Sequence, residues 1–176
     1  MGTKKSHIWD MVGAYPICPG CGSKQVVRDA WAAWSMASQD WQLQAIFDHF
    51  SCDNCGDEGV PDWRVDEAYR QQRIRRLNDL LRRGQAEHAT IVMTAGVKAE
   101  GDKFVRQALE GTMTFDAFGE DNDPRGEHDF GAFEIDGQKL FFKIDYLDLK
   151  MERHSDDAAN PARTHRVLTI MLASEY

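Results

Sequence analysis

Alternating apolar and polar positions predict a β-hairpin in the first third of the chain. In residues 41–50, apolar side chains take every second position from Trp41 to Phe47, which is the period that a β-strand produces. Residues 26–34 form a second β-rich run, and residues 35–40 connect the two. We therefore expect two paired strands over these ranges.

After the hairpin, the apolar residues recur with the period of an α-helix. Residues 63–83 are expected to form a helix, with Asp62 as its cap and Gly84 as its stop signal. Its apolar stripe is Ile74, Leu77, Leu80 and Leu81.

Two more elements are predicted before residue 120. Residues 90–94 read as a short buried strand that ends in a turn, and residues 102–117 read as a helix. Gly111 lies on the apolar face of that helix, where it either weakens the helix or permits close packing. The other residues of this face are Phe104, Ala108, Phe115 and Phe118.

The dipeptide Asp136-Gly137 between two alternating runs predicts a hairpin with a two-residue turn. Such a turn fixes the register. The expected pairs are Ile135 with Gln138, Glu134 with Lys139, Phe133 with Leu140, Ala132 with Phe141, Phe130 with Lys143, and His128 with Asp145. The expected core face is Phe133, Leu140, Phe142 and Ile144. Asn160-Pro161 is a cap-and-first-turn signal for a short helix, and residues 167–173 favour a buried strand over a helix.

All four cysteines fall into two Cys-x-x-Cys pairs, separated by thirty residues, which is the spacing of a tetrathiolate metal site. The predicted ligands are Cys18, Cys21, Cys52 and Cys55. Gly22 and Gly56 follow the pairs, where a chain that folds around an ion often needs positive φ. Four thiolates complete a tetrahedral zinc site and leave no position for water, so the predicted zinc is structural, one per chain. A rubredoxin-like iron site and two short disulfides remain as alternatives.

Together these patterns predict an α+β protein. A zinc ribbon, in which a β-hairpin joins two Cys-x-x-Cys knuckles, occupies residues 1–60. A small α+β domain with an antiparallel sheet and two main helices occupies residues 61–176. Residues 1–16 include Lys4, Lys5 and Asp10 and have no apolar core of secretory length, and no apolar run is long enough to span a membrane. We expect a cytoplasmic protein.

The charge is uneven. The formal net charge is −8, yet residues 64–83 carry seven arginines against three acids, while residues 102–157 carry fifteen acids against seven bases. A net negative chain makes general nucleic-acid binding weak at most. The helical face with Arg70, Arg73, Arg75 and Arg76 is the expected site for nucleic acid or for an acidic partner, and otherwise it is simply solvated.

Two further groups of residues allow a functional and a structural interpretation. Trp31, Trp34 and Trp41 could stack on single-stranded nucleic acid, or they could form the small ribbon's core or its docking surface. A metal or general-base site could form from Glu127, His128, Asp129 and Asp145, near Asp121 and Asp123. The alternative is a hydrogen bond between His128 and Asp145 that joins two strand ends.

The C-terminal sequence resembles an uncharacterised bacterial family, a domain of unknown function. The resemblance rests on residues 126–134 (Gly-Glu-His-Asp-Phe-Gly-Ala-Phe-Glu), 143–146 (Lys-Ile-Asp-Tyr) and 166–176, and it covers residues 73–176. The ribbon is similar to a small zinc module of plasmid and mobile-element proteins. The resemblance implies no reaction, and it favours a role in mobile-element upkeep or in evading host defence.

Three functions are consistent with the sequence. The first is a non-catalytic, zinc-containing accessory protein that binds a protein partner, and we favour it. The second is an acidic inhibitor of a nucleic-acid-binding host defence complex, which would use the acidic charge. The third is a divalent-metal hydrolase built on His128 and its neighbouring carboxylates.

Overall fold

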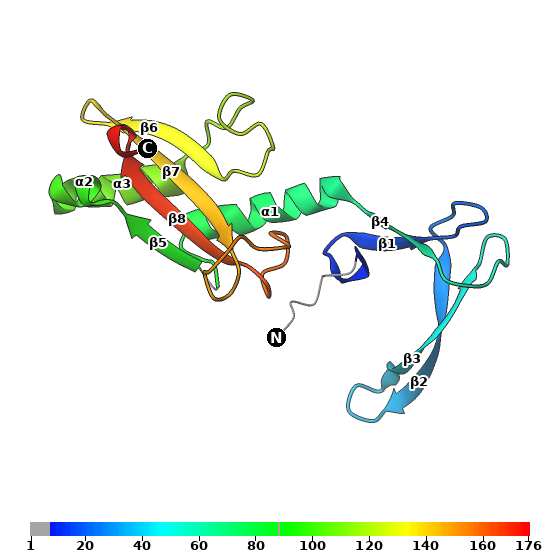
Figure 1. The fold of residues 1–176 in the computed structure, drawn as a ribbon. Coiled ribbons are helices and arrows are strands. Elements are labelled where there is room, and N and C mark those ends of the chain that lie inside the picture. The colour runs from blue at the N-terminus through cyan, green and yellow to red at the C-terminus, as the bar shows by residue number, and fades with distance from the viewer. Residues whose placement is uncertain (1–7, 88) are drawn as a thin grey trace. The chain divides into compact units, whose positions relative to one another are not determined.

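The computed structural model describes residues 8–87 and 89–176, so Lys4 and Lys5 of the expected non-secretory N-terminus lie outside the described residues. The chain is a mixed α+β protein, as predicted, with the four cysteines gathered in its N-terminal part. Contacts divide it into two compact units, Met1–Asp66 (unit 1) and Glu67–Tyr176 (unit 2). Figure 1 shows the elements of each unit.

Unit 1 consists of two antiparallel strand pairs, β1 with β4 and β2 with β3. The predicted hairpin is confirmed, and its strands are slightly longer than expected. Its ladder has irregularities between Arg28 and Ala30 and between Trp31 and Ala32. The elements are η1 (Ile8–Asp10), β1 (Ala14–Ile17), β2 (Val26–Ser35), β3 (Asp40–Cys52) and β4 (Asp62–Val65).

The prediction that a helix begins at residue 63 with Asp62 as its cap is wrong. Strand β4 occupies these positions because its residues pair with β1, for example Tyr15 with Arg64. The ring centroid of Trp63 lies 6.5 Å from that of Trp9, which adds an aromatic contact to the ladder. The helix starts at Glu67 instead.

Unit 2 is built on a four-stranded sheet in the order β5-β8-β7-β6. The expected antiparallel sheet is antiparallel except at β5, which runs parallel to β8. The C-terminal strand is confirmed, whereas residues 161–163 form a turn rather than the expected helix. The elements are α1 (Glu67–Arg82), β5 (Ala89–Met93), α2 (Ala95–Ala99), α3 (Asp102–Thr114), β6 (Phe130–Ile135), β7 (Gln138–Leu147), β8 (His165–Leu172) and η2 (Ala173–Glu175).

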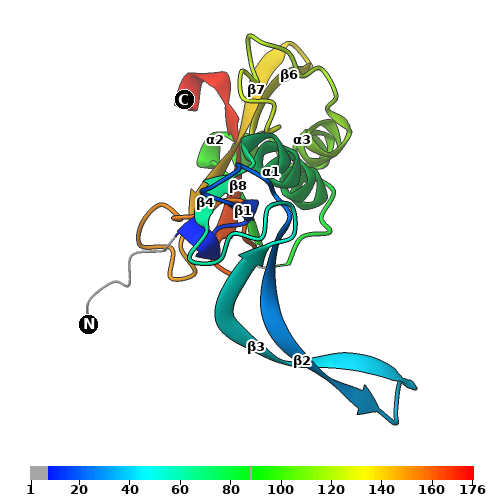
Figure 2. The same cartoon turned by 90° about the vertical axis from the view of Figure 1, so that its right-hand side faces the viewer.

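The β6–β7 hairpin has the register that its two-residue turn predicts, from Ile135 opposite Gln138 to Phe130 opposite Lys143. The predicted core face is also confirmed, with Phe133 packed against the fully buried part of the core. Helices α1 and α3 lie on one side of the sheet (Figure 2). The buried core residues are Leu81, Val97, Phe104, Ala108, Leu140, Phe142, Ile144, Leu168 and Ile170.

Helix α3 ends at Thr114, three residues before the predicted end, and the short helix α2 was not predicted. Phe115 has left the helix with ψ 128°, and its ring packs against Phe118 and Phe142. The aromatic residues of this segment therefore reach the core from an extended chain.

Gly111 of α3 permits close packing. A Cβ at this position would lie 2.6 Å from the Phe133 ring. We expect Gly111→Ala to lower the free energy of unfolding by about 1 kcal/mol, because overpacking of about 1–3 kcal/mol exceeds a helix-propensity gain of about 1 kcal/mol. Urea denaturation measures the change.

Gly119→Ala is the matched control, because a Cβ there meets no atom within 4 Å. Equal stability of the two variants would contradict the close-packing interpretation of Gly111.

Candidate functional site

The four cysteine sulfurs form a compact group at the base of the β2–β3 hairpin. Their Sγ atoms all lie within 4.8 Å of one another, and Cys18–Cys55 and Cys21–Cys52 are each 3.7 Å apart. A tetrahedral ion with bonds of about 2.3 Å places its sulfur ligands about 3.8 Å apart. The group is therefore shaped to hold one tetrahedral metal ion.

The two knuckles have the same local geometry. The N–H of Gly22 donates to the Cys18 carbonyl and the N–H of Gly56 to the Cys52 carbonyl, each at 2.8 Å. Gly22 has φ 72° and Gly56 has φ 73°, as predicted, so both turns use a left-handed conformation that favours glycine. Two independent segments of sequence thus build one symmetric cradle.

Polar neighbours favour the ionised form of one of these thiols. The backbone of Ser23, followed by the side chain of Asn54, lowers the pKa of Cys21 to about 6. The Nδ2 of Asn54 lies 3.5 Å from the Cys21 sulfur. A thiolate is the form that binds metal.

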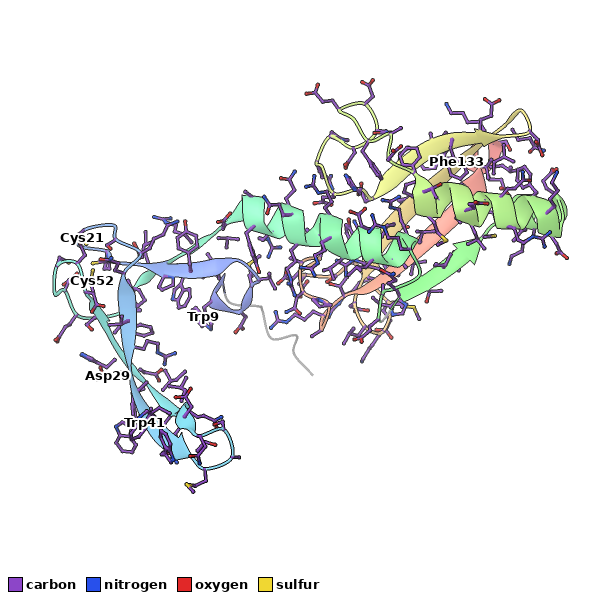
Figure 3. The ribbon with its side chains drawn as sticks, turned by 180° about the vertical axis from the view of Figure 1, so that it is seen from behind. Trp9, Cys21, Asp29, Trp41, Cys52 and Phe133 are labelled. Atoms are coloured by element: carbon purple, nitrogen blue, oxygen red, sulfur yellow. The ribbon has the colours of Figure 1, made fainter. Side chains whose placement is uncertain are left out.

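The hairpin above this cradle exposes an unusual amount of apolar surface, which we call the aromatic hairpin surface. Trp31 is 66% exposed and Trp41 is 65% exposed. Figure 3 shows Cys21 and Cys52 at one end of the hairpin and Trp41 towards the other. The surface comprises Val27, Trp31, Trp34, Met36, Trp41, Leu43, Ile46 and Phe47.

These tryptophans do not form a buried core, which corrects one of the two structural interpretations. They pair with each other on the surface: the rings of Trp34 and Trp41 lie 5.7 Å apart, and those of Trp31 and Phe47 lie 5.0 Å apart. Since an aromatic side chain carries about 150–250 Å², the three tryptophans alone expose on the order of 300 Å². Monomers rarely expose patches of that kind without a function.

The predicted contact between His128 and Asp145 is wrong. Strand β6 begins at Phe130, and His128 precedes it with φ 58°. The chain turns there because the Asp123 carboxylate accepts hydrogen bonds from the backbone N–H groups of Glu127 and His128. Asp145 instead forms an ion pair with Lys143 at 2.8 Å.

The His128 ring belongs to a different cluster. Its Nδ1 lies 2.9 Å from Oδ1 of Asp79 on α1, and its ring stacks on Phe118 with centroids 3.7 Å apart. Asp79 also accepts a hydrogen bond from Arg82 at 2.6 Å. This contact joins α1 to the loop before β6.

The four residues of the expected hydrolase site are not brought together as a ligand set. Glu127 accepts a hydrogen bond from the hydroxyl of Tyr146 at 3.1 Å, and burial raises its pKa. Burial also raises the pKa of Asp129. Within the described parts of the chain, the cysteines form the one group of side chains with the spacing of metal ligands.

A buried polar network on α1 was not predicted from the sequence. Asn78 is fully buried and its Nδ2 donates to the Glu127 carbonyl at 2.9 Å and to the Tyr146 hydroxyl at 2.7 Å. Its Oδ1 accepts from Nε of the buried Arg166 at 3.1 Å. Asn78 and Arg82 occupy inward positions of α1, whereas the predicted Leu77 and Leu80 are only half-buried. Ile74 and Leu81 are buried as expected.

The expected outward basic face of α1 is only half correct. Arg70 forms an ion pair with the buried Asp157 at 2.8 Å, and Nε of Arg73 donates to the Ala159 carbonyl at 3.0 Å. These two arginines therefore hold the loop between β7 and β8. Arg75 and Arg76 are exposed.

The Asp79 contacts predict a pH effect. Burial raises the pKa of Asp79, but hydrogen bonds from Arg82 and His128 outweigh burial and hold it below the ordinary value. A lowered carboxyl pKa stabilises the fold at neutral pH, and that contribution is lost as pH falls through the lowered value. We expect the stability advantage of the wild-type chain over Asp79→Asn to shrink on acidification.

Urea denaturation of both proteins between about pH 7 and pH 2 measures this difference. The difference isolates Asp79 from Glu127 and Asp129, whose raised pKa values act in the opposite direction. A constant difference across that range would show that Asp79 is not the group responsible.

Within the described residues, no helix combines the length and the apolarity needed to cross a membrane. Residues 93–175 match the model of a family described as "Protein of unknown function (DUF3768)". The match lies in unit 2, so it does not include the cysteine cradle or the hairpin. No curated protein and no solved structure matches the chain. The C-terminal part of the chain, residues 93–175, is therefore similar to the DUF3768 family, whose description names no function.

Proposed function

We propose that this protein is a non-catalytic interaction protein that binds a partner protein through the aromatic hairpin surface. The observation that carries the proposal is the exposure of three tryptophans on a hairpin whose base is a four-cysteine cradle. Tryptophan is enriched among the residues that dominate binding energy at protein interfaces. A rigid hairpin presents such anchors at a low entropic cost.

The metal in this proposal is zinc. Its thiolate bond length of about 2.3 Å fits the sulfur spacing, and four thiolates leave no open coordination position. The cradle would thus stabilise the hairpin rather than take part in a reaction. Metal analysis of purified protein tests the identity, and a stoichiometric content of iron would contradict it.

The charge of the hairpin favours a protein partner over nucleic acid. Between residues 26 and 52, Arg28 is the single Lys or Arg, and it forms an ion pair with Asp48. Asp29 and Asp40 add further negative charge. Proteins that stack bases on aromatic rings also need cations along the phosphate backbone, and this surface offers none in excess.

A comparison of two forms of the chain tests the proposal. Wild-type protein and Trp34→Ser/Trp41→Ser would be used to isolate partners from nuclease-treated cell extract, with both loaded with metal. Quantitative mass spectrometry should find a protein that the wild type enriches at least tenfold over the variant. That protein, once purified, should bind the wild type in a direct titration and lose at least tenfold in affinity for the variant.

Equal recovery of all proteins by the two forms would contradict the proposal. Binding that appears only when the nuclease treatment is omitted would assign the surface to nucleic acid instead. The matched control is Gln42→Ala/Gln44→Ala on β3, which changes exposed polar residues of the same hairpin and should leave binding intact.

A further inference from the structure

Helix α1 carries a second surface, in unit 2, that the proposed function does not use. Arg75, Arg76 and Arg83 are all exposed, and together with Gln72 and Leu80 they line a hollow of roughly 270 Å³. We call these five residues the α1 arginine surface.

Arg75 and Arg76 of α1, and Arg83 directly after it, differ from the other arginines of this segment. Arg70 and Arg82 are committed to Asp157 and Asp79. Among the residues that the structure describes, Arg75, Arg76 and Arg83 have no ion pair. Like charges close together on a helix destabilise it. The repulsion among these three arginines therefore lowers the stability of the helix, and a bound anion would offset that loss.

One acid also lines this hollow. Asp79 accepts hydrogen bonds from Arg82 and His128, so its charge is already neutralised within unit 2. The local excess is therefore positive, although the whole chain carries a formal charge of −8. An anionic partner would meet an isolated cationic patch.

An apolar hollow of roughly 280 Å³ adjoins the arginines and shares Leu80 with them. Its apolar lining residues are Leu77, Leu80, Ala86 and Pro161, and its polar ones are Gln85, Glu87 and Arg166. Recognition of a phosphate backbone depends on cations, and an apolar hollow adds nothing to it. A peptide with acidic residues around one large apolar side chain would fit both features, in the manner of a helix or turn that inserts an anchor.

We propose that the α1 arginine surface and this adjoining hollow bind an acidic segment of a partner protein. The acidic side chains pair with Arg75, Arg76 and Arg83, and one apolar side chain enters the hollow between Leu77 and Leu80. This site shares no residue with the aromatic hairpin surface. Either of the two proposals can therefore fail while the other holds.

A displayed library of random peptides of about 16 residues is the probe, selected against the full-length wild-type protein at an ionic strength of about 0.15 M. Counter-selection with Arg75→Glu/Arg76→Glu removes peptides that bind elsewhere, including those on the hairpin. The recovered peptides should combine several Asp or Glu residues with a Leu, Phe or Trp. Synthetic copies should bind the variant at least tenfold more weakly than the wild type.

Both proteins must keep the same far-UV circular dichroism spectrum and the same unfolding midpoint, which is expected because these arginines make no ion pair among the residues that the structure describes. A variant that loses stability is replaced by Arg75→Gln/Arg76→Gln, which removes the charge without reversing it. The conservative variant Arg75→Lys/Arg76→Lys should retain most of the binding.

Three results would overturn the proposal. The first is a recovered pool without an acidic bias, or an empty pool. The second is tighter binding of a single-stranded or duplex DNA oligonucleotide than of the selected peptides. The third is self-association of the wild-type chain that Arg75→Glu/Arg76→Glu abolishes, because this would assign the surface to a second copy.

Discussion

Removal of the metal is expected to unfold unit 1 and to leave unit 2 folded. A two-stranded hairpin is marginally stable in water, whereas structural zinc contributes on the order of 10 kcal/mol to the folding of small modules. The cradle adjoins the ladder directly, since Cys52 pairs with Val26 across the base of the hairpin. We therefore expect Cys52→Ser to have the same effect as a chelator.

The sequence provides a selective probe for this test. All five tryptophans, at positions 9, 31, 34, 41 and 63, belong to unit 1. Tryptophan emission thus follows unit 1 alone, and amide exchange across Ala89–Met93 and His165–Leu172 follows the sheet of unit 2. Addition of zinc to chelated wild-type protein should restore the original emission, but it should not restore that of Cys52→Ser.

Emission and exchange that stay unchanged in a verified metal-free, reduced sample would contradict the structural role of the metal. Simultaneous loss of protection in both units would contradict their division into separate compact units. Each outcome is visible in the same pair of measurements.

Replacement of Asn78 is expected to lower the stability of unit 2 substantially. Asn78→Ala removes two donated hydrogen bonds and one accepted bond at a fully buried position. The Tyr146 hydroxyl keeps its contact with Glu127, but Arg166 Nε loses an acceptor in a buried setting. A loss of about 3 kcal/mol in the free energy of unfolding follows, because buried polar groups without partners cost about 1–3 kcal/mol each.

Urea denaturation monitored by far-UV circular dichroism measures this loss. Gln72→Ala is the matched control, because it removes an exposed amide from the same helix and should change stability by less than about 0.5 kcal/mol. Similar values for the two variants would mean that the Asn78 network does not stabilise the fold.

Features encoded within a few residues could be predicted from the sequence. The two-residue turn at 136–137 fixed the whole β6–β7 register, because a hairpin of this kind leaves no freedom of alignment. The two Cys-x-x-Cys spacings identified the cradle, and the glycines after them have the expected positive φ. The C-terminal strand followed from its branched apolar run.

Features that depend on distant partners could not be predicted. Residues 63–65 resemble a helix start, yet they form β4 because β1 lies about fifty residues earlier in the chain. Asn78 is buried through partners that are 49, 68 and 88 residues away. His128 was displaced from its expected pair by Asp123, whose side chain binds the backbone of residues 127 and 128, so that β6 begins only at Phe130. The pattern of apolar and polar residues within a short segment does not reveal any of these three features.

The sequence left open, for a different reason, whether the tryptophans of the aromatic hairpin surface form a core or a docking surface. Alternation along β3 correctly predicted a strand, and alternation usually means that one face is buried. The same pattern arises when the apolar face is reserved for a partner, because the sequence records which side chains are apolar but not what covers them. The exposed fraction of Trp31 and Trp41 provided the distinction.

The most direct test of the account measures partner binding as a function of the metal. The purified partner would be titrated with metal-loaded protein, with chelated protein, with protein reloaded with zinc, and with metal-loaded Trp34→Ser/Trp41→Ser. We predict tight binding that chelation abolishes and zinc restores, and that the tryptophan variant lacks although it retains its metal. Binding that survives both chelation and the loss of Trp34 and Trp41 would contradict the claim that a metal-anchored hairpin is the interaction surface.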